Sequence, residues 1–163
     1  MPQGRQRPLA GGHMALTAPQ RRVLRYVILG NSVAGIAAAQ EIRRHDPDGQ
    51  VTIVSDETTF GYSRAMLPLY IAGKKAKRDT VFAPRAFYAS ERIRLLRGET
   101  AASVDAREQQ VHLGSGRRLP YDRLLVATGS SSRTLDVPGK GLPGIFPLRK
   151  MTDAEAIKRD LRS

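Results

Sequence analysis

The sequence predicts a three-layer α/β domain, in which a mostly parallel sheet with helices is joined by a small antiparallel meander. Two observations carry this prediction. A strand, a tight glycine turn, a helix and a second strand follow one another within about 32 residues from Val23, which is typical of the βαβ unit of a parallel sheet. Short strand-like runs between residues 93 and 119 then surround Gly114-Ser115-Gly116, a turn signal that predicts antiparallel pairing.

The first strand is predicted at Val23–Leu29 and the helix at Ala34–His45, where alanine and inward-facing isoleucine recur at helical spacing. Residues 46–49, with the sequence Asp-Pro-Asp-Gly, end the helix and turn the chain. The second strand is predicted at Val51–Val54. Together these segments complete the βαβ unit.

Residues 58–79 have the composition of a loop, with a helical piece predicted around Met66–Ala72. Pro84 opens a short helix that continues to about Glu91. Short strands are then predicted at Ile93–Leu96, Ala101–Val104, Gln110–Leu113 and Arg117–Leu119.

A last strand is predicted at Leu124–Ala127, where it is stopped by Thr128-Gly129. Residues 138–144, rich in proline and glycine, form an irregular connector. A final helix is predicted to start at Thr152, because Thr152 and Glu155 have the spacing of a capping box.

Composition limits the classes of protein to which the chain can belong. The 163 residues suffice for one ordinary domain, and 40% apolar with 26% charged residues argue against wholesale disorder and against a coiled coil. No apolar run approaches the roughly 20 residues that span a bilayer, so no membrane partner is expected. Cysteine is absent, which excludes disulfides, thiolate metal sites and cysteine nucleophiles. The three histidines are scattered, and no metal site is predicted.

The net charge of +12 raises the question of nucleic-acid binding. Residues 1–22, rich in Pro, Gly, Gln and Arg, are predicted to be a disordered basic tail, and the folded domain is predicted at 23–163. Outside the tail the only compact basic run is Lys74 to Arg78, so a solvated basic surface is favoured over a nucleic-acid site. Because the tail lacks the apolar core of a secretory signal, the expected location is cytoplasmic. Translation can start at Met1 or at Met14.

The turn between the first strand and the helix carries the main chemical signal. Gly30 stands where the strand must turn tightly into the helix, and Gly35 where the helix packs on the strand. Ser32 replaces the middle glycine of the dinucleotide-binding pattern, but it is small and its hydroxyl can donate to a phosphate. The free N–H groups at the start of the helix favour a diphosphate there. The pattern predicts an FAD- or NAD(P)-binding Rossmann-like domain.

Two carboxylates, Asp56 and Glu57, follow the second strand and strengthen this prediction. A carboxylate at this point can accept hydrogen bonds from both ribose hydroxyls of a dinucleotide, and it would repel the 2′-phosphate of NADP. The alternative is that Gly30 and Gly35 only tighten a turn and that both acids are surface residues.

Four blocks of residues occur in order between about residues 23 and 160: Leu29–Gly35 with Ser55-Asp56-Glu57, Tyr62–Leu67, Tyr121–Gly129, and Val137–Gly139 followed by Gly144–Arg149 and Asp153. In this order they resemble the two-dinucleotide-binding-domain flavoproteins of the pyridine nucleotide-disulfide oxidoreductase family. The similarity is greatest to the branch of ferredoxin and rubredoxin reductases, apoptosis-inducing-factor-like proteins and the flavin module of nitrite reductase. It covers only the N-terminal, FAD-binding portion of that family.

The resemblance implies a set of FAD-binding residues. Gly30, Ser32, Ala34 and Gly35 would line the pyrophosphate, and Asp56, together with Glu57, would hold the adenosine ribose. The remaining residues implied at the cofactor are Asn31, Arg64, Ala101, Thr128, Gly129 and Arg149. For Arg64 and Arg149 the alternative is an ordinary surface arginine.

The resemblance also implies a function, namely an FAD-dependent oxidoreductase that passes electrons from NAD(P)H through FAD to an acceptor. The acceptor would be a ferredoxin, a rubredoxin, or an iron–sulfur or nitrite reductase. Because cysteine is absent, no redox cysteine takes part, and no catalytic residue is predicted. The NAD(P)H domain of the family would follow Ser163, so a fragment or a missing partner chain is expected, and the 163-residue chain alone is expected to be inactive.

Two alternatives remain open at this point. One is an NAD-binding dehydrogenase domain without flavin, and the other is a non-enzymatic basic binding module. The sequence names neither the electron acceptor, nor the choice between NADH and NADPH, nor the oligomeric state.

Overall fold

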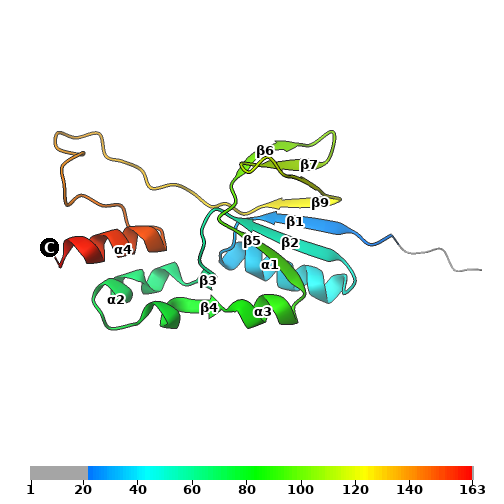
Figure 1. The fold of residues 1–163 in the computed structure, drawn as a ribbon, viewed down its shortest axis with the longest axis horizontal. Helices are drawn as coiled ribbons and strands as arrows, with labels where there is room; N and C mark the ends of the chain where they lie inside the picture. The colour runs from blue at the N-terminus through cyan, green and yellow to red at the C-terminus, as the bar shows by residue number, and fades with distance from the viewer. Residues whose placement is uncertain (1–21, 163) are drawn as a thin grey trace, which may run out of the picture.

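A four-stranded parallel sheet forms the centre of the molecule, and the computed structural model describes it within residues 22–162. The strand order is β5-β2-β1-β9 (Figure 1), and all three neighbouring pairs are parallel. The strands are β1 (Arg25–Leu29), β2 (Gln50–Ser55), β5 (Ile93–Arg97) and β9 (Arg123–Val126). The predicted tail, residues 1–22, lies outside the described residues except for Arg22.

Helices cover one face of this sheet and an antiparallel sheet covers the other (Figure 1). The first layer contains α1 (Val33–His45) and α3 (Arg85–Ser90), and the third contains β6 (Ala101–Asp105), β7 (Gln110–Leu113) and β8 (Arg118–Pro120). Successive residues of a strand point to opposite faces, so Ile28 packs under α1 while Val27 and Leu29 pack under the meander. The predicted three-layer α/β fold with a small antiparallel meander is confirmed.

A third apolar cluster packs the last helix, α4 (Met151–Asp160), against the short helix α2 (Leu67–Ile71). Leu67 of α2 packs with Met151 and Ala154 of α4. Two short paired strands, β3 (Gly61–Tyr62) and β4 (Val81–Ala83), and two 3₁₀ turns, η1 (Arg64–Met66) and η2 (Lys77–Thr80), lie within and directly after the segment 58–79 that was predicted as a loop. Sequence periodicity could not reveal such short elements, because two or three residues carry no pattern.

The predicted capping box at the start of the last helix is wrong. The helix begins at Met151, and the Asp153 carboxylate caps it by accepting the backbone N–H groups of Arg149 (2.9 Å) and Lys150 (2.7 Å). Glu155 instead accepts a hydrogen bond from Lys77 at 2.6 Å. The helix therefore begins at Met151 and not at Thr152. Its capping carboxylate is that of Asp153 and not that of Glu155.

One buried carboxylate fastens the first strand of the sheet to the last. Asp122, which directly precedes β9, is 7% exposed and accepts hydrogen bonds from the backbone N–H of Arg25 (2.8 Å) and from its Nε (3.0 Å). Arg22 donates to the same carboxylate at 2.5 Å. Hydrogen bonds from the Arg25 side chain and backbone, together with the charge of Arg22, hold the pKa of Asp122 well below its usual range.

We predict that Asp122→Asn lowers the Tm by several degrees at pH 7, because the amide keeps the shape but removes the charge that two arginines compensate. The folded pKa of Asp122 is depressed, so its stabilisation is present above the unfolded carboxyl pKa of about 4 and is lost as the pH falls towards the folded value. The Tm difference between wild type and variant should therefore shrink below about pH 4. Thermal unfolding followed by circular dichroism measures it.

Asp136→Asn is the matched control, because the Asp136 side chain is 95% exposed and forms a surface ion pair with Lys140. Equal Tm values for wild type and Asp122→Asn at pH 7 would contradict the fastening role of Asp122.

Candidate functional site

A cleft of about 610 Å³ opens at the carboxyl ends of β1, β2 and β9. In open parallel sheets, ligands bind at this edge. Eleven of the twelve residues predicted at the cofactor line the cleft, all except Gly35: Gly30, Asn31, Ser32, Ala34, Asp56, Glu57, Arg64, Ala101, Thr128, Gly129 and Arg149. The structure thus brings together side chains from segments up to 119 residues apart in sequence, from Gly30 to Arg149.

Two glycines make the turn from β1 into α1 possible. Gly30 has a φ of +117°, which favours glycine. A Cβ built on it would lie 2.2 Å from the backbone oxygen of Ala127, the residue that directly follows the neighbouring strand β9. A Cβ on Gly35 would lie 2.0 Å from the Gly30 carbonyl oxygen. Gly35 therefore serves the close packing of helix on strand and does not itself face the cleft, which is the role that its position in the pattern predicts.

The first turn of α1 presents polar groups to the cleft. The Ser32 carbonyl accepts the first helical hydrogen bond, from the Ile36 N–H at 3.0 Å, so the N–H groups before Ile36 have no partner inside the helix. The Ser32 side chain makes no capping hydrogen bond, which leaves its hydroxyl available. Asn31 differs, because its Oδ1 accepts a hydrogen bond from the Tyr88 hydroxyl at 2.7 Å. The Asn31 side chain thus braces the turn against α3.

The two carboxylates after β2 have different surroundings. Asp56 is 53% exposed and accepts a hydrogen bond from Lys150 Nζ at 2.6 Å, which, as the largest cause, lowers the pKa of Asp56. Glu57 is only 12% exposed and accepts hydrogen bonds from the Tyr62 hydroxyl (2.7 Å) and from Arg64 (2.8 Å). Glu57 is therefore occupied by protein donors, whereas Asp56 keeps exposed surface in the cleft.

Tyr62 connects Glu57 to the last helix. Its hydroxyl donates to Glu57 and accepts the Met151 backbone N–H at 2.9 Å. Burial, reinforced by the Glu57 carboxylate, raises the pKa of Tyr62 to about 12. The hydroxyl thus remains a hydrogen-bond donor at ordinary pH.

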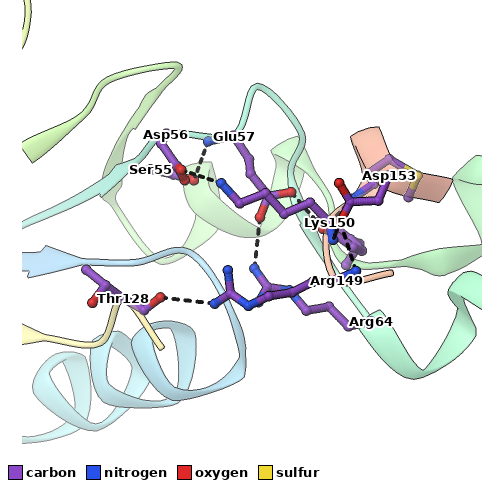
Figure 2. A network of polar contacts seen from close by, with 10 residues as sticks. Ser55, Asp56, Glu57, Arg64, Thr128, Arg149, Lys150 and Asp153 are labelled. Carbon is purple, nitrogen blue, oxygen red and sulfur yellow. Dashed lines mark hydrogen bonds and ion pairs between the residues drawn. The ribbon is translucent and has the colours of Figure 1, made fainter. Parts of the chain in front are cut away.

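Two arginines, 85 positions apart in sequence, line the cleft (Figure 2). Arg64 points towards Glu57, while Arg149 donates to the Thr128 carbonyl at 3.4 Å. Within residues 22–162, Arg149 forms no ion pair, so most of its donors remain open to the cleft. Gly129 lies directly beside this guanidinium, because a Cβ there would be 3.0 Å from Arg149 Nη2.

Sequence reasoning missed several residues of the cleft. Lys150 and Tyr62 line it, as do the hydroxyl-bearing residues Ser130, Ser131 and Ser132. Tyr62 stands in a block that the resemblance singled out, and Lys150 directly follows Arg149, so position in these blocks was the available signal. The contact of Lys150 with Asp56 and that of Tyr62 with Met151 join residues 94 and 89 positions apart, and such contacts leave no local pattern.

Within residues 22–162, no group of three His, Asp or Glu side chains is placed to hold a metal ion. In the same part of the chain, every helix is too short or too polar to cross a bilayer.

Comparisons with known proteins agree with this geometry. Residues 24–163 match the model of the pyridine nucleotide-disulphide oxidoreductase family. The chain is 33% identical over 138 residues to rhodocoxin reductase of Rhodococcus erythropolis, covering 84% of this chain and 32% of that protein. It is 35% identical over 139 residues to putidaredoxin reductase of Pseudomonas putida, covering 83% and 33%.

A solved structure shows the same fold. The NADH:rubredoxin oxidoreductase of Clostridium acetobutylicum superposes with a TM-score of 0.77 and 29% identity, over 86% of this chain and 36% of that chain. The chain thus spans about a third of the length of the relatives that it matches. With the family model matched over nearly its whole length, this chain belongs to the pyridine nucleotide-disulphide oxidoreductase family, a family of oxidoreductases.

Proposed function

We propose that the cleft binds FAD and that the chain is the FAD-binding part of an NAD(P)H-dependent electron-transfer flavoprotein. The observation that carries the proposal is the meeting of three features in one cleft. These are a glycine turn that admits no Cβ, a helix N-terminus with free N–H groups, and a half-exposed carboxylate at the end of the next strand. A dinucleotide needs all three, for backbone approach, for the diphosphate and for the ribose.

The residues divide along the cleft by the part of the cofactor that they suit. Gly30, Ser32 and Ala34 would hold the diphosphate at the start of α1. Asp56 would accept the ribose hydroxyls, because it is the carboxylate with free surface, while Glu57 holds Arg64 in place through their 2.8 Å ion pair. Arg149, with open donors, is a further candidate for an anionic part of the cofactor.

FAD would supply the redox chemistry, exchanging two electrons with a nicotinamide and passing them on to an acceptor. The chain's own residues bind and orient the cofactor, and none of them needs to act as an acid, a base or a nucleophile. The names of the relatives point to small electron carriers as acceptors, since they are reductases of rhodocoxin, putidaredoxin and rubredoxin. We extend this class of acceptor, a small redox protein of the ferredoxin or rubredoxin kind, to the protein that contains this chain.

We predict that the purified chain takes up FAD and shows the yellow absorbance of oxidised flavin, and that Asp56→Asn weakens FAD binding about tenfold. The amide keeps one acceptor oxygen but replaces the other with an NH₂ donor, and it loses the charge that strengthens hydrogen bonds to an ionised carboxylate. Titration calorimetry with FAD and, in parallel, with NAD⁺ measures both affinities.

The control for Asp56→Asn is Asp136→Asn, which changes an exposed carboxylate outside the cleft. Tight binding of NAD⁺ with no uptake of FAD would contradict the proposal and would favour a dehydrogenase domain without flavin.

We also predict that the 163-residue chain loaded with FAD does not oxidise NADH or NADPH at an enzymatic rate. Holding the nicotinamide against the flavin requires a second dinucleotide site, and such positioning is worth roughly 7–11 kcal/mol of the barrier. Among residues 22–162, only the cleft at Gly30 combines a glycine turn with a helix N-terminus after a strand. Consumption of NADH with a dye acceptor is the measurement, and turnover of about 1 s⁻¹ or faster would contradict the prediction.

A further inference from the structure

Lys150 reaches across the cleft from the start of α4 to the carboxylate after β2 (Figure 2). Its Nζ lies 2.6 Å from Asp56 Oδ2, and the two residues are 94 positions apart in sequence. The side chains are 34% and 53% exposed, so the pair stands at the surface of the cleft rather than in the core. None of the sequence patterns identified Lys150 as a site residue.

The backbone that carries Lys150 is firmly held. The Asp153 carboxylate accepts the Lys150 N–H at 2.7 Å, and the next N–H, of Met151, donates to the buried Tyr62 hydroxyl at 2.9 Å. Met151 itself is 1% exposed and packs in the cluster between α2 and α4. The ammonium group therefore extends from a fixed backbone, and only the side-chain rotamers of Lys150 have to be ordered for the contact.

The contact leaves part of Asp56 free. A carboxylate has two oxygens with about four acceptor positions, and Lys150 occupies one of them on Oδ2. Among residues 22–162, no other side chain donates to Asp56, and the further donor is its own backbone N–H, so acceptor positions of this half-exposed carboxylate remain open to the cleft. Lys150 also lowers the pKa of Asp56, which keeps this carboxylate charged and able to accept.

We propose that Lys150 is a positioning residue of the nucleotide site, which fixes the Asp56 carboxylate so that its remaining acceptor positions receive a ribose hydroxyl. This inference rests on the proposed dinucleotide-binding function. It assigns Lys150 a role that acts through Asp56, and it differs from a direct contact between the ammonium group and a phosphate. The two roles make opposite predictions for a ligand that has a ribose but no phosphate.

The test compares binding of adenosine and of ADP to Lys150→Met, Asp56→Asn and the double variant, by calorimetry or NMR titration. We expect Lys150→Met to weaken both ligands by the same factor, about two- to fivefold, the size expected for a partly exposed ion pair. In the Asp56→Asn background the same substitution should change neither affinity, because the group through which it acts is gone. Lys150→Arg keeps the charge and should restore most of the loss.

Lys140→Met is the matched control, since Lys140 forms a 2.6 Å pair with Asp136 outside the cleft. It should leave both affinities unchanged, and thermal unfolding should show that all variants remain folded.

The outcomes separate the inference from the function on which it rests. A loss for ADP alone, persisting in the Asp56→Asn background, would overturn the positioning role in favour of a phosphate contact. Unchanged affinities in Lys150→Met would overturn any role for Lys150 while leaving the proposed function intact. If the wild-type chain binds neither ADP nor FAD, the proposed function fails, and the inference fails with it.

Discussion

The close approach of α1 to β1 is the constraint on which the rest of the molecule depends. At Gly35 the helix lies so near the preceding turn that an added Cβ would be 2.0 Å from the Gly30 carbonyl oxygen. The first turn of α1 thereby lies at the carboxyl edge of the sheet. In the same turn the Gly30 N–H donates to the Val54 carbonyl of β2 at 2.8 Å. The N–H groups at the helix start then face the cleft, which any larger residue at Gly35 would push away.

Burial on both faces of the sheet holds that edge in place. Ile28 and Ile53, both fully buried, pack against the helices, while Val27, Leu29 and Val54 pack against the meander. A parallel sheet needs such cover on both sides, because its strands carry apolar side chains on both faces. Since the ends of β1, β2 and β9 line the cleft, a core that fixes these strands also fixes the spacing of the groups at their ends.

The sequence predicts what depends on local pattern and misses what depends on distant contacts. The βαβ unit, the meander and the residues of the glycine turn follow from periodicity and turn chemistry, and all of these lie where expected. The contacts from Lys150 to Asp56 and from Tyr62 to Met151 join residues 94 and 89 positions apart, and no local pattern encodes them. The start of α4 shows the same limit, because the Thr152–Glu155 spacing indicated a capping box, whereas Asp153 caps the helix and Glu155 contacts Lys77, 78 positions away.

The two neighbouring carboxylates show how tertiary contacts divide roles that the sequence leaves equal. Asp56 and Glu57 are adjacent acids after one strand, and both were candidates for the ribose. Adjacent strand-end residues point in different directions, so Glu57 is turned to Tyr62 and Arg64 and is nearly buried, where an unpaired charge would be costly. Asp56 lines the cleft and is paired with one ammonium group, that of Lys150, which compensates its charge yet leaves its side chain 53% exposed. A carboxylate that binds a ligand must be partly satisfied and partly free, and of these two neighbours Asp56 meets both conditions.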